Sequence, residues 1–313
     1  MLSVKDFSLQ FVRNICEKAT YYENKPKDMS NLDYQNKILM NIFFEPSTRT
    51  MLSFQTAMYN FGGKVINFNK EISSMNKGES FKDTIMTLRN FADIFVIRHP
   101  EIGKVQEAEK ILNKPVINAG DGAGEHPTQA LLDFYTIYKH FDIFNESTNL
   151  NILFIGDIEN SRTIHSLDIL LKKISNINIH YKPYDKNNLS VEKKKELGLN
   201  VKYYPNLEEY DVIYYTRIQK ERIINTTTSY DKNDILDLEK MKIIKKNAII
   251  MHPLPRNNEI SPDVDNDPRC VYFEQIENGI YVRMAILNSL FTDKTRIDKS
   301  TAILFAEINQ WEL

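Results

Sequence analysis

Residues Ile38 to Thr50 read I-L-M-N-I-F-F-E-P-S-T-R-T, an apolar run that ends in a proline and a group of hydroxyl and basic side chains. The run at 38–44 has the length of a buried strand. After Thr50, apolar residues recur at helical spacing from Leu52 to Phe61. This stretch therefore predicts a strand, a polar loop and a helix in succession.

The same pattern recurs along most of the chain. Alternating strands and helices of this kind predict an α/β fold, with parallel sheets covered on both faces. Further strands are predicted at 65–68, 94–97, 115–119, 152–155, 177–181, 201–204, 212–215 and 248–251, and further helices at 81–92, 131–138, 163–173 and 234–246.

A polar stretch at 145–151 separates two series of these units, and 313 residues suit about two domains at roughly 150 residues each. We expect two doubly wound domains, residues 1–140 and 141–285. The segment from Tyr281 to Trp311 has a helical pattern, and we expect its residues 286–313 to pack back on the first domain.

Composition limits the partners. Forty basic and forty-two acidic side chains give a net charge of −2, which offers no general attraction to nucleic acid or to anionic lipid. No run of eighteen apolar residues indicates a membrane helix, and the charged first eighteen residues do not resemble a signal peptide, so we expect a cytoplasmic protein. Cys16 and Cys270 lack metal-site spacing and are expected to be buried thiols.

Ligands of parallel α/β sheets bind at the carboxyl ends of the strands. Ser47, Thr48, Arg49 and Thr50 follow such an end and open a helix, where backbone N–H groups and the helix dipole favour an anion. Arg49 can add paired charge-assisted hydrogen bonds, which suits a phosphate. The alternative is an ordinary helix cap beside a solvated arginine.

A second unusual loop has three glycines in residues 120–124, followed by His126 and a proline that can start a helix. Glycines allow a backbone to approach a ligand closely. His126 and Gln129 would face that ligand, and the imidazole could stabilise charge on a carbonyl oxygen. The alternative is a histidine that caps its own helix.

The polar loop at 69–79 carries Ser73 and Lys77 and few apolar side chains. Such a loop could reach a site some distance away. A solvated surface loop is the alternative, and the residues alone favour it.

Three strand ends of the second domain carry cations or a proline-rich turn. Arg162 opens a predicted helix, and Arg217 and Gln219 follow the strand at 212–215. Two arginines at adjacent strand ends suit two carboxylates, although surface ion pairs are the alternative. The turn H-P-L-P at 252–255 has carbonyl groups that could bind an amino group.

The common phosphate-loop, dinucleotide and zinc motifs, G-x-x-x-x-G-K-[ST], G-x-G-x-x-G, H-E-x-x-H and C-x-x-C, do not occur in the sequence. Nucleotide hydrolysis, hydride transfer and zinc chemistry are therefore disfavoured. We expect neither a cofactor nor a metal.

Three motifs together resemble the carbamoyltransferases, and within them the aspartate carbamoyltransferases. They are F-x-E-x-S-T-R-T from Phe43, H-P-T-Q-A-L-L-D from His126 and H-P-L-P-R-x-x-E-I from His252, in a match that covers about residues 36–290. The resemblance implies a carbamoyl-phosphate domain followed by an aspartate domain. It also implies a homotrimer with shared active sites and a step of pyrimidine biosynthesis.

The resemblance also assigns roles to residues. It implies phosphate binding by Ser47, Thr48, Arg49, Thr50 and Arg98, carbamoyl contacts from His126 and Gln129, and Ser73 and Lys77 reaching the neighbouring subunit's site. It implies aspartate binding by Arg162, Arg217, Gln219 and the Leu254–Pro255 backbone, with a cis peptide before Pro255. The group acting in catalysis would be Arg49, Thr50, Lys77, Arg98 and His126.

The implied reaction is direct attack of the aspartate amine on the carbamoyl carbon, with a phosphate oxygen as proton acceptor. Arg217 and Gln219 favour aspartate over ornithine, because a carboxylate in place of an ammonium about 4 Å from one arginine changes the energy by several kcal/mol. Glu159 and Ser161 depart from the lysine and glycine that are frequent in the family, so we expect Glu159→Lys to lower the KM for aspartate.

Three alternatives remain at this stage. They are a carbamoyltransferase for another amine such as ornithine, a non-catalytic homologue that keeps the fold, and a nucleotide-binding Rossmann-type protein. Intact Arg49, His126 and Arg217 argue against the second, and the missing glycine motif against the third. The sequence carries no signal for a regulatory chain, a multienzyme partner or nucleotide feedback.

Overall fold

The computed structural model describes residues 1–25, 34–185, 189–219 and 234–292. The chain divides into two structural units. The first contains residues 1–2, 14–122 and the chain from Ile280, and the second contains residues 3–13 and 123–279.

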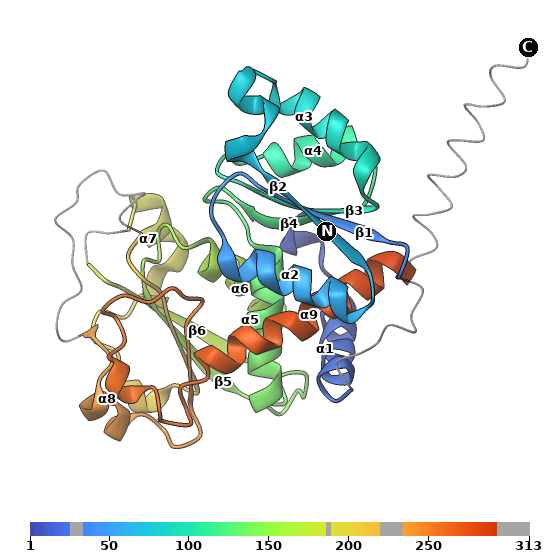
Figure 1. Ribbon diagram of the computed structural model, residues 1–313. Helices are drawn as coiled ribbons and strands as arrows, with labels where there is room; N and C mark the ends of the chain where they lie inside the picture. The colour runs from blue at the N-terminus through green and yellow to red at the C-terminus, as the bar shows by residue number, and fades with distance from the viewer. Residues whose placement is uncertain (26–33, 186–188, 220–233, 293–313) are drawn as a thin grey trace, which may run out of the picture. The chain divides into compact units, whose positions relative to one another are not determined.

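The first unit has a four-stranded parallel sheet in the order β2-β1-β3-β4. Figure 1 shows helices α3 and α4 on one face of this sheet and helix α2 on the other. The strands are β1 (Ile38–Phe43), β2 (Lys64–Asn69), β3 (Ile94–His99) and β4 (Val116–Asp121). The helices are α2 (Thr48–Asn60), α3 (Phe81–Leu88), α4 (Lys104–Leu112) and the part of α1 (Leu9–Glu23) from Asn14 onward.

Strands β1 and β3 are buried on both faces, which explains their nearly continuous apolar sequence. Met40 and Ile42 pack in one cluster with Ile85 of α3 and Val105 of α4. The outer strand β2 is mostly exposed or half-buried. The central strands therefore anchor the loops that follow them.

The second unit repeats this architecture with a parallel sheet in the order β6-β5-β7-β8. Tyr214 of β7 donates a hydrogen bond to Asp133 of α5, while Leu153 and Ile213 pack with Met241 of α8 on the other face. The strands are β5 (Leu150–Gly156), β6 (Ile177–Pro183), β7 (Val212–Tyr215) and β8 (Ile249–Met251). The helices are α5 (Pro127–His140), α6 (Arg162–Leu171), α7 (Val191–Leu197) and α8 (Leu238–Ile243).

Short 3-10 helices join several of these elements. They are η1 (Val4–Asp6), η2 (Lys70–Ile72), η3 (Ser74–Lys77), η4 (Arg89–Phe91), η5 (Gly198–Asn200), η6 (Leu207–Glu209) and η9 (Pro262–Val264).

Helix α9 (Tyr272–Thr292) begins nine residues before the helical pattern predicts. Its later turns pack on the first unit, where the Asn288 side chain donates to the Tyr34 hydroxyl at 2.9 Å and the Arg283 guanidinium lies 5.1 Å from the centre of the Phe54 ring. Of the predicted C-terminal segment 286–313, the described residues 286–292 thus belong to the first unit. Residues 293–313 of that prediction lie outside the described residues.

The two parallel sheets with flanking helices confirm the predicted α/β class. The predicted strand at 201–204 is wrong, because only Val201 pairs with β6, through a single bridge to Tyr181. Tyr204 is 85% exposed, and Pro205 has no N–H group to extend a ladder. No described helix has both the length and the apolar character needed to cross a membrane.

Candidate functional site

The loop from β1 to α2 leads into a helix amino terminus whose hydrogen-bond donors can bind an anion. Ser47 occupies the N-cap position of α2, yet its hydroxyl makes no capping hydrogen bond. Thr48 and Arg49 are exposed, and Thr50 is buried. The first N–H groups of the helix have no acceptor within it, so they and the Ser47 hydroxyl can bind an anion. The alternative of an ordinary side-chain cap is wrong for Ser47.

Arg98 lies beside this loop on the neighbouring strand. Phe43 and Arg98 are register partners, and the Phe44 N–H donates to the Arg98 carbonyl at 2.9 Å. The guanidinium forms an ion pair with Glu45, with 2.6 Å between Nε and Oε1, and donates from Nη1 to the Ala119 carbonyl at 3.4 Å. Strand pairing thus brings the Ser47–Thr50 loop and Arg98 together.

Glu45 received no role from the sequence, although it is the glutamate of the F-x-E-x-S-T-R-T motif. Its carboxylate offsets the charge of Arg98 and orients the guanidinium. The position of Glu45 two residues before Ser47 places it in the loop after β1. The register of β1 on β3 brings that loop next to Arg98.

The glycine-containing loop after β4 packs against its own unit. Gly122 has φ +55°, and a Cβ atom there would lie 2.8 Å from the Pro100 carbonyl oxygen. The Gly103 N–H donates to the Asp121 carboxylate at 3.1 Å. Close approach of two protein loops therefore accounts for Gly122, where the sequence interpretation invoked a ligand.

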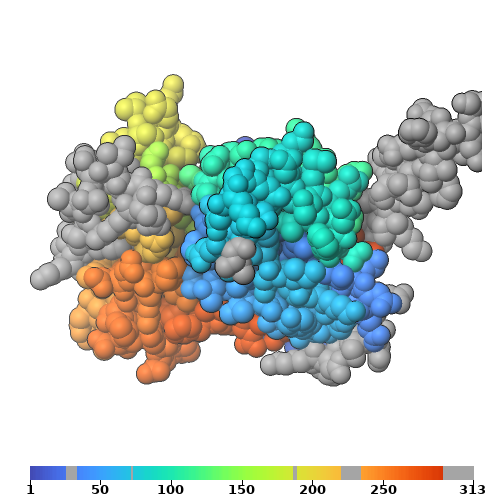
Figure 2. All heavy atoms as spheres, turned by 45° about the horizontal axis from the view of Figure 1, so that its top comes forward, coloured from blue at the N-terminus to red at the C-terminus, as the bar shows by residue number. Residues whose placement is uncertain are grey.

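Ser73 and Lys77 lie on the segment between β2 and α3, part of which faces the viewer in Figure 2. The Ser73 hydroxyl donates to the Lys70 carbonyl at 2.8 Å and accepts from the Met75 N–H at 3.3 Å. Lys77 is exposed. Their predicted role in a neighbouring subunit's site stays a prediction.

His126 and Gln129 open α5, in the second unit. His126 is buried at the N-cap position, and its ring does not cap the helix, which contradicts the capping alternative. The backbone N–H of His126 donates to the Ser166 hydroxyl of α6 at 2.9 Å. Gln129 donates from Nε2 to Asp133 Oδ1 at 2.8 Å. Both residues are thus held by buried partners from the second unit.

The ends of β5 and β7 place Arg162 and Gln219 beside one connected polar network. Asp157 follows β5 and accepts hydrogen bonds from the Gln219 N–H at 3.0 Å and from the Asn160 side chain at 2.9 Å. Gln219 Nε2 donates to the Asn160 carbonyl at 2.9 Å. Arg162 begins α6 and is 7% exposed, and Arg217 lies two residues before Gln219.

Asp157 and Asn160 are the site-supporting residues that sequence reasoning missed here. The sequence feature that could have identified them is the short acidic turn between β5 and α6, which follows a strand end where a ligand-binding loop was expected.

The turn after β8 is fixed by a buried histidine and glutamate. The His252 Nδ1 accepts from the Leu254 N–H at 2.8 Å, so its Nε2 carries the proton donated to Glu259 Oε1, also at 2.8 Å. Burial raises the pKa of Glu259, but the His252 hydrogen bond and backbone donors outweigh it and lower that pKa overall. The Leu254–Pro255 peptide bond is cis, as the resemblance implies.

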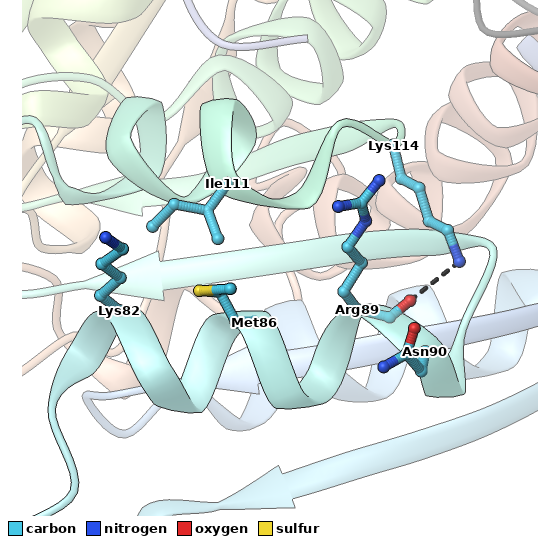
Figure 3. A pocket seen from close by; sticks show the side chains of 6 residues that line it. All are labelled: Lys82, Met86, Arg89, Asn90, Ile111 and Lys114. Atoms are coloured by element: carbon cyan, nitrogen blue, oxygen red, sulfur yellow. Dashed lines mark hydrogen bonds between the residues drawn. The ribbon is translucent and has the colours of Figure 1, made fainter. Parts of the chain in front are cut away.

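A separate pocket lies between α3 and α4 and contains no predicted site residue (Figure 3). Lys114 on its rim donates to the carbonyl groups of Arg89 and Ala92, both at 2.8 Å. Lys82, Met86, Asn90 and Ile111 complete its lining. Over the described parts of the chain, no cluster of three or more His, Cys, Asp or Glu side chains could hold a metal ion.

Family models match nearly the whole chain. The model described as aspartate/ornithine carbamoyltransferase, carbamoyl-P binding domain, matches residues 1–139, and its companion, the Asp/Orn binding domain, matches residues 148–290. These two matches span both sheets and every predicted site residue.

Curated relatives and solved structures agree with these models. The aspartate carbamoyltransferase catalytic subunit of Methanococcus maripaludis strain S2 is 40% identical, over 95% of this chain and 99% of that protein. The multifunctional protein pyr1-3 of Dictyostelium discoideum is 44% identical over 82% of this chain, which spans only 12% of its length. A Trypanosoma cruzi aspartate transcarbamoylase, crystallised with carbamoyl phosphate and aspartate, is 35% identical with a TM-score of 0.82, covering 92% of this chain and 93% of that one.

Proposed function

Because the chain belongs to the aspartate/ornithine carbamoyltransferase family, we propose that it transfers the carbamoyl group of carbamoyl phosphate to the α-amine of L-aspartate, giving N-carbamoyl-L-aspartate and phosphate. The observation that carries the choice of acceptor is the network at the ends of β5 and β7. There Arg162 and Arg217 would supply positive charge, and Gln219 an amide group, for a dicarboxylate.

The amino terminus of α2 supports binding of the phosphate group. Backbone N–H groups, the Ser47 hydroxyl and the Arg49 guanidinium offer donors in the geometry that favours an anion. Arg98 is already paired with Glu45, so an incoming phosphate would compete with that carboxylate for the guanidinium. Carbamoyl-phosphate binding should therefore release Glu45 from Arg98.

The carbamoyl group would be addressed by His126 and Gln129. A hydrogen bond from His126 and the charge of Arg98 would stabilise the oxyanion as the aspartate amine attacks the carbamoyl carbon. The C–O bond to phosphate then breaks, and a phosphate oxygen accepts the proton of the amine. Catalysis rests on juxtaposition of the substrates and on fixed positive charge.

Acceptor choice follows from charge. At a distance of about 4 Å and an effective dielectric constant of about 20, the Coulomb energy between two unit charges is about 4 kcal/mol. It is favourable between an arginine and a carboxylate and unfavourable between an arginine and an ammonium group. Ornithine in the place of aspartate would therefore lose several kcal/mol beside Arg217. The carbonyl groups of the turn at Leu254 and Pro255 would accept hydrogen bonds from the substrate's amino group.

We further propose a cytoplasmic homotrimer in which Ser73 and Lys77 enter the site of a neighbouring copy. Exposed apolar side chains on α2 and β2, including Tyr59 and Ile66, support contact with another chain. We propose the functional domains as residues 1–140 with 286–313 for carbamoyl phosphate, and residues 141–285 for aspartate.

The proposal is tested by incubating the purified protein with carbamoyl phosphate and L-aspartate and measuring both products. We expect N-carbamoyl-L-aspartate and phosphate in a one-to-one ratio, with no metal or cofactor added. Native mass spectrometry of the same sample tests the trimer separately. Phosphate release without carbamoyl-aspartate would refute the proposed transfer.

A further inference from the structure

A buried carboxylate joins two parts of the proposed site within the second unit. Asp133 of α5 has no exposed surface. Its Oδ1 accepts from Gln129 Nε2 at 2.8 Å and from Gln275 Nε2 at 2.5 Å, and its Oδ2 accepts from the Tyr214 hydroxyl at 2.7 Å. A buried charge of this kind is stable only where such donors surround it.

The hydrogen bond to Asp133 fixes the orientation of the Gln129 amide. Because Nε2 donates to the carboxylate, the amide oxygen Oε1 is turned away from it and remains an acceptor. An uncharged apolar neighbour in the place of Asp133 would let the amide turn over. Asp133 therefore determines which polar atom of Gln129 is offered to a ligand.

Gln275 of α9 extends the connection to the turn after β8. While its Nε2 donates to Asp133, its Oε1 accepts from the His252 N–H at 3.0 Å. His252 in turn accepts from the Leu254 N–H through Nδ1. Gln129, Asp133, Gln275 and His252 thus form one continuous chain of hydrogen bonds, and all of them are at most 9% exposed.

We propose that Asp133 and Gln275 are positioning residues that set, through this chain, the Gln129 amide and the 252–255 turn in a single arrangement. The inference rests on the proposed function, in which Gln129 addresses the carbamoyl group and the turn addresses the amino group of aspartate. Neither positioning residue need touch a substrate. Their effect is to hold the contacts to the carbamoyl group and to the attacking amine in one register.

The same two helices provide a matched control one turn further along. Asn278 of α9 donates to the Thr136 hydroxyl of α5 at 3.0 Å, and both residues are buried. This pair lies three residues beyond Gln275 and Asp133, respectively, and joins α5 to α9 without a link to Gln129 or His252. Thr136→Val removes its hydroxyl and nearly preserves its volume.

The test compares Gln275→Met with Thr136→Val in the full-length enzyme. Gln275→Met removes the donor to Asp133 and the acceptor for the His252 N–H, and we expect it to raise the KM for both substrates and to lower kcat/KM for aspartate about 100-fold. Thr136→Val should change these constants by less than about twofold, although both variants lower the melting temperature.

A second variant covers the case in which Gln275→Met fails to fold. In Gln275→Glu the new carboxyl group faces Asp133 from α5, the Tyr214 hydroxyl from β7, and His252 with its partner Glu259 from the turn. Burial and then Asp133 raise the pKa of Tyr214 well above its usual value, so that hydroxyl stays neutral. The nearby Asp133 charge and burial should likewise raise the pKa of the new group.

When it is protonated, the new carboxyl group can donate to Asp133 and accept from His252, as the glutamine does. We therefore expect kcat/KM of Gln275→Glu, divided by that of the wild type, to rise at least tenfold as the pH falls from about 9 to about 6. A melting-temperature series over the same range separates this effect from unfolding.

Wild-type kinetic constants in Gln275→Met, equal losses in Thr136→Val, or a ratio in folded Gln275→Glu that stays at least about tenfold below one from about pH 9 to about pH 6 would overturn the inference. A wild-type enzyme that forms no carbamoyl-aspartate would instead refute the proposed function. The two failures are therefore distinguishable.

Discussion

Asp157→Asn should weaken aspartate binding specifically, because it replaces one carboxylate oxygen at the junction of the two loops that are proposed to bind aspartate. In the wild type, Oδ1 accepts from the Asn160 N–H and side chain, and Oδ2 accepts from the Gln219 N–H. An amide has only one acceptor oxygen. If that oxygen keeps the two bonds to Asn160, the new NH₂ group faces the Gln219 N–H across 3.0 Å, donor against donor.

The magnitude follows from that conflict. Loss of one hydrogen bond to a charged acceptor costs about 1.5–3 kcal/mol. If the Gln219 loop moves to separate the two donors, Gln219 leaves the position proposed for aspartate binding, and the free energy of aspartate binding becomes less favourable. Since 1.4 kcal/mol corresponds to a factor of ten, the KM for aspartate should rise about 10- to 100-fold, while the KM for carbamoyl phosphate stays within about twofold.

Steady-state kinetics with each substrate varied in turn provide the assay. Asp168→Asn is the matched control, because Asp168 is also a buried aspartate, in the later half of α6, but its partners are Tyr181 and Lys172. That variant should lose stability and retain its KM for aspartate. An unchanged KM for aspartate in folded Asp157→Asn, or an equal rise in Asp168→Asn, would refute the reasoning.

Three further predictions concern other parts of the molecule. Arg49→Ala should lower kcat/KM by at least about 1,000-fold in the phosphate-release assay, since it removes charge from the developing phosphate, and near-normal turnover would exclude that role. Glu159→Lys should lower the KM for aspartate, as the sequence predicts, and should also lower the melting temperature slightly, because Glu159 accepts from the Ser190 N–H at 3.0 Å; a higher KM would contradict the charge argument. Hydrogen bonds from His140 and then a neighbouring lysine lower the pKa of Glu274 to about 2, so its stabilisation is complete above the unfolded value near 4.5 and is lost as the pH falls toward 2. The difference in unfolding free energy between wild type and Glu274→Gln, measured with urea, should therefore shrink over that interval and not grow.

The sequence predicted the strands that are buried on both faces most reliably. The runs at 38–44 and 94–97 are apolar because helices cover both sides of β1 and β3. A continuous apolar run of this kind can be recognised as a strand without knowing which strand it pairs with. The segment at 201–204 also carries the valine and tyrosines that strands favour, but only Val201 pairs with the sheet. Pairing depends on neighbours that local composition does not show.

The residues that are proposed to contact ligands could be named from their motifs, but the residues that hold them could not. Glu45, Asp133 and Glu259 each occur within a quoted motif, yet their partners lie on other elements of the chain or several residues away. Gln275 lies 142 residues from Asp133. Only the fold shows that these distant side chains share hydrogen bonds.

The most direct test of the central claim is the ratio of kcat/KM for L-aspartate to kcat/KM for L-ornithine, measured with saturating carbamoyl phosphate. The positive charge assigned to Arg162 and Arg217 predicts a ratio above about 1,000, which corresponds to the several kcal/mol separating attraction from repulsion. A ratio near or below one would contradict it.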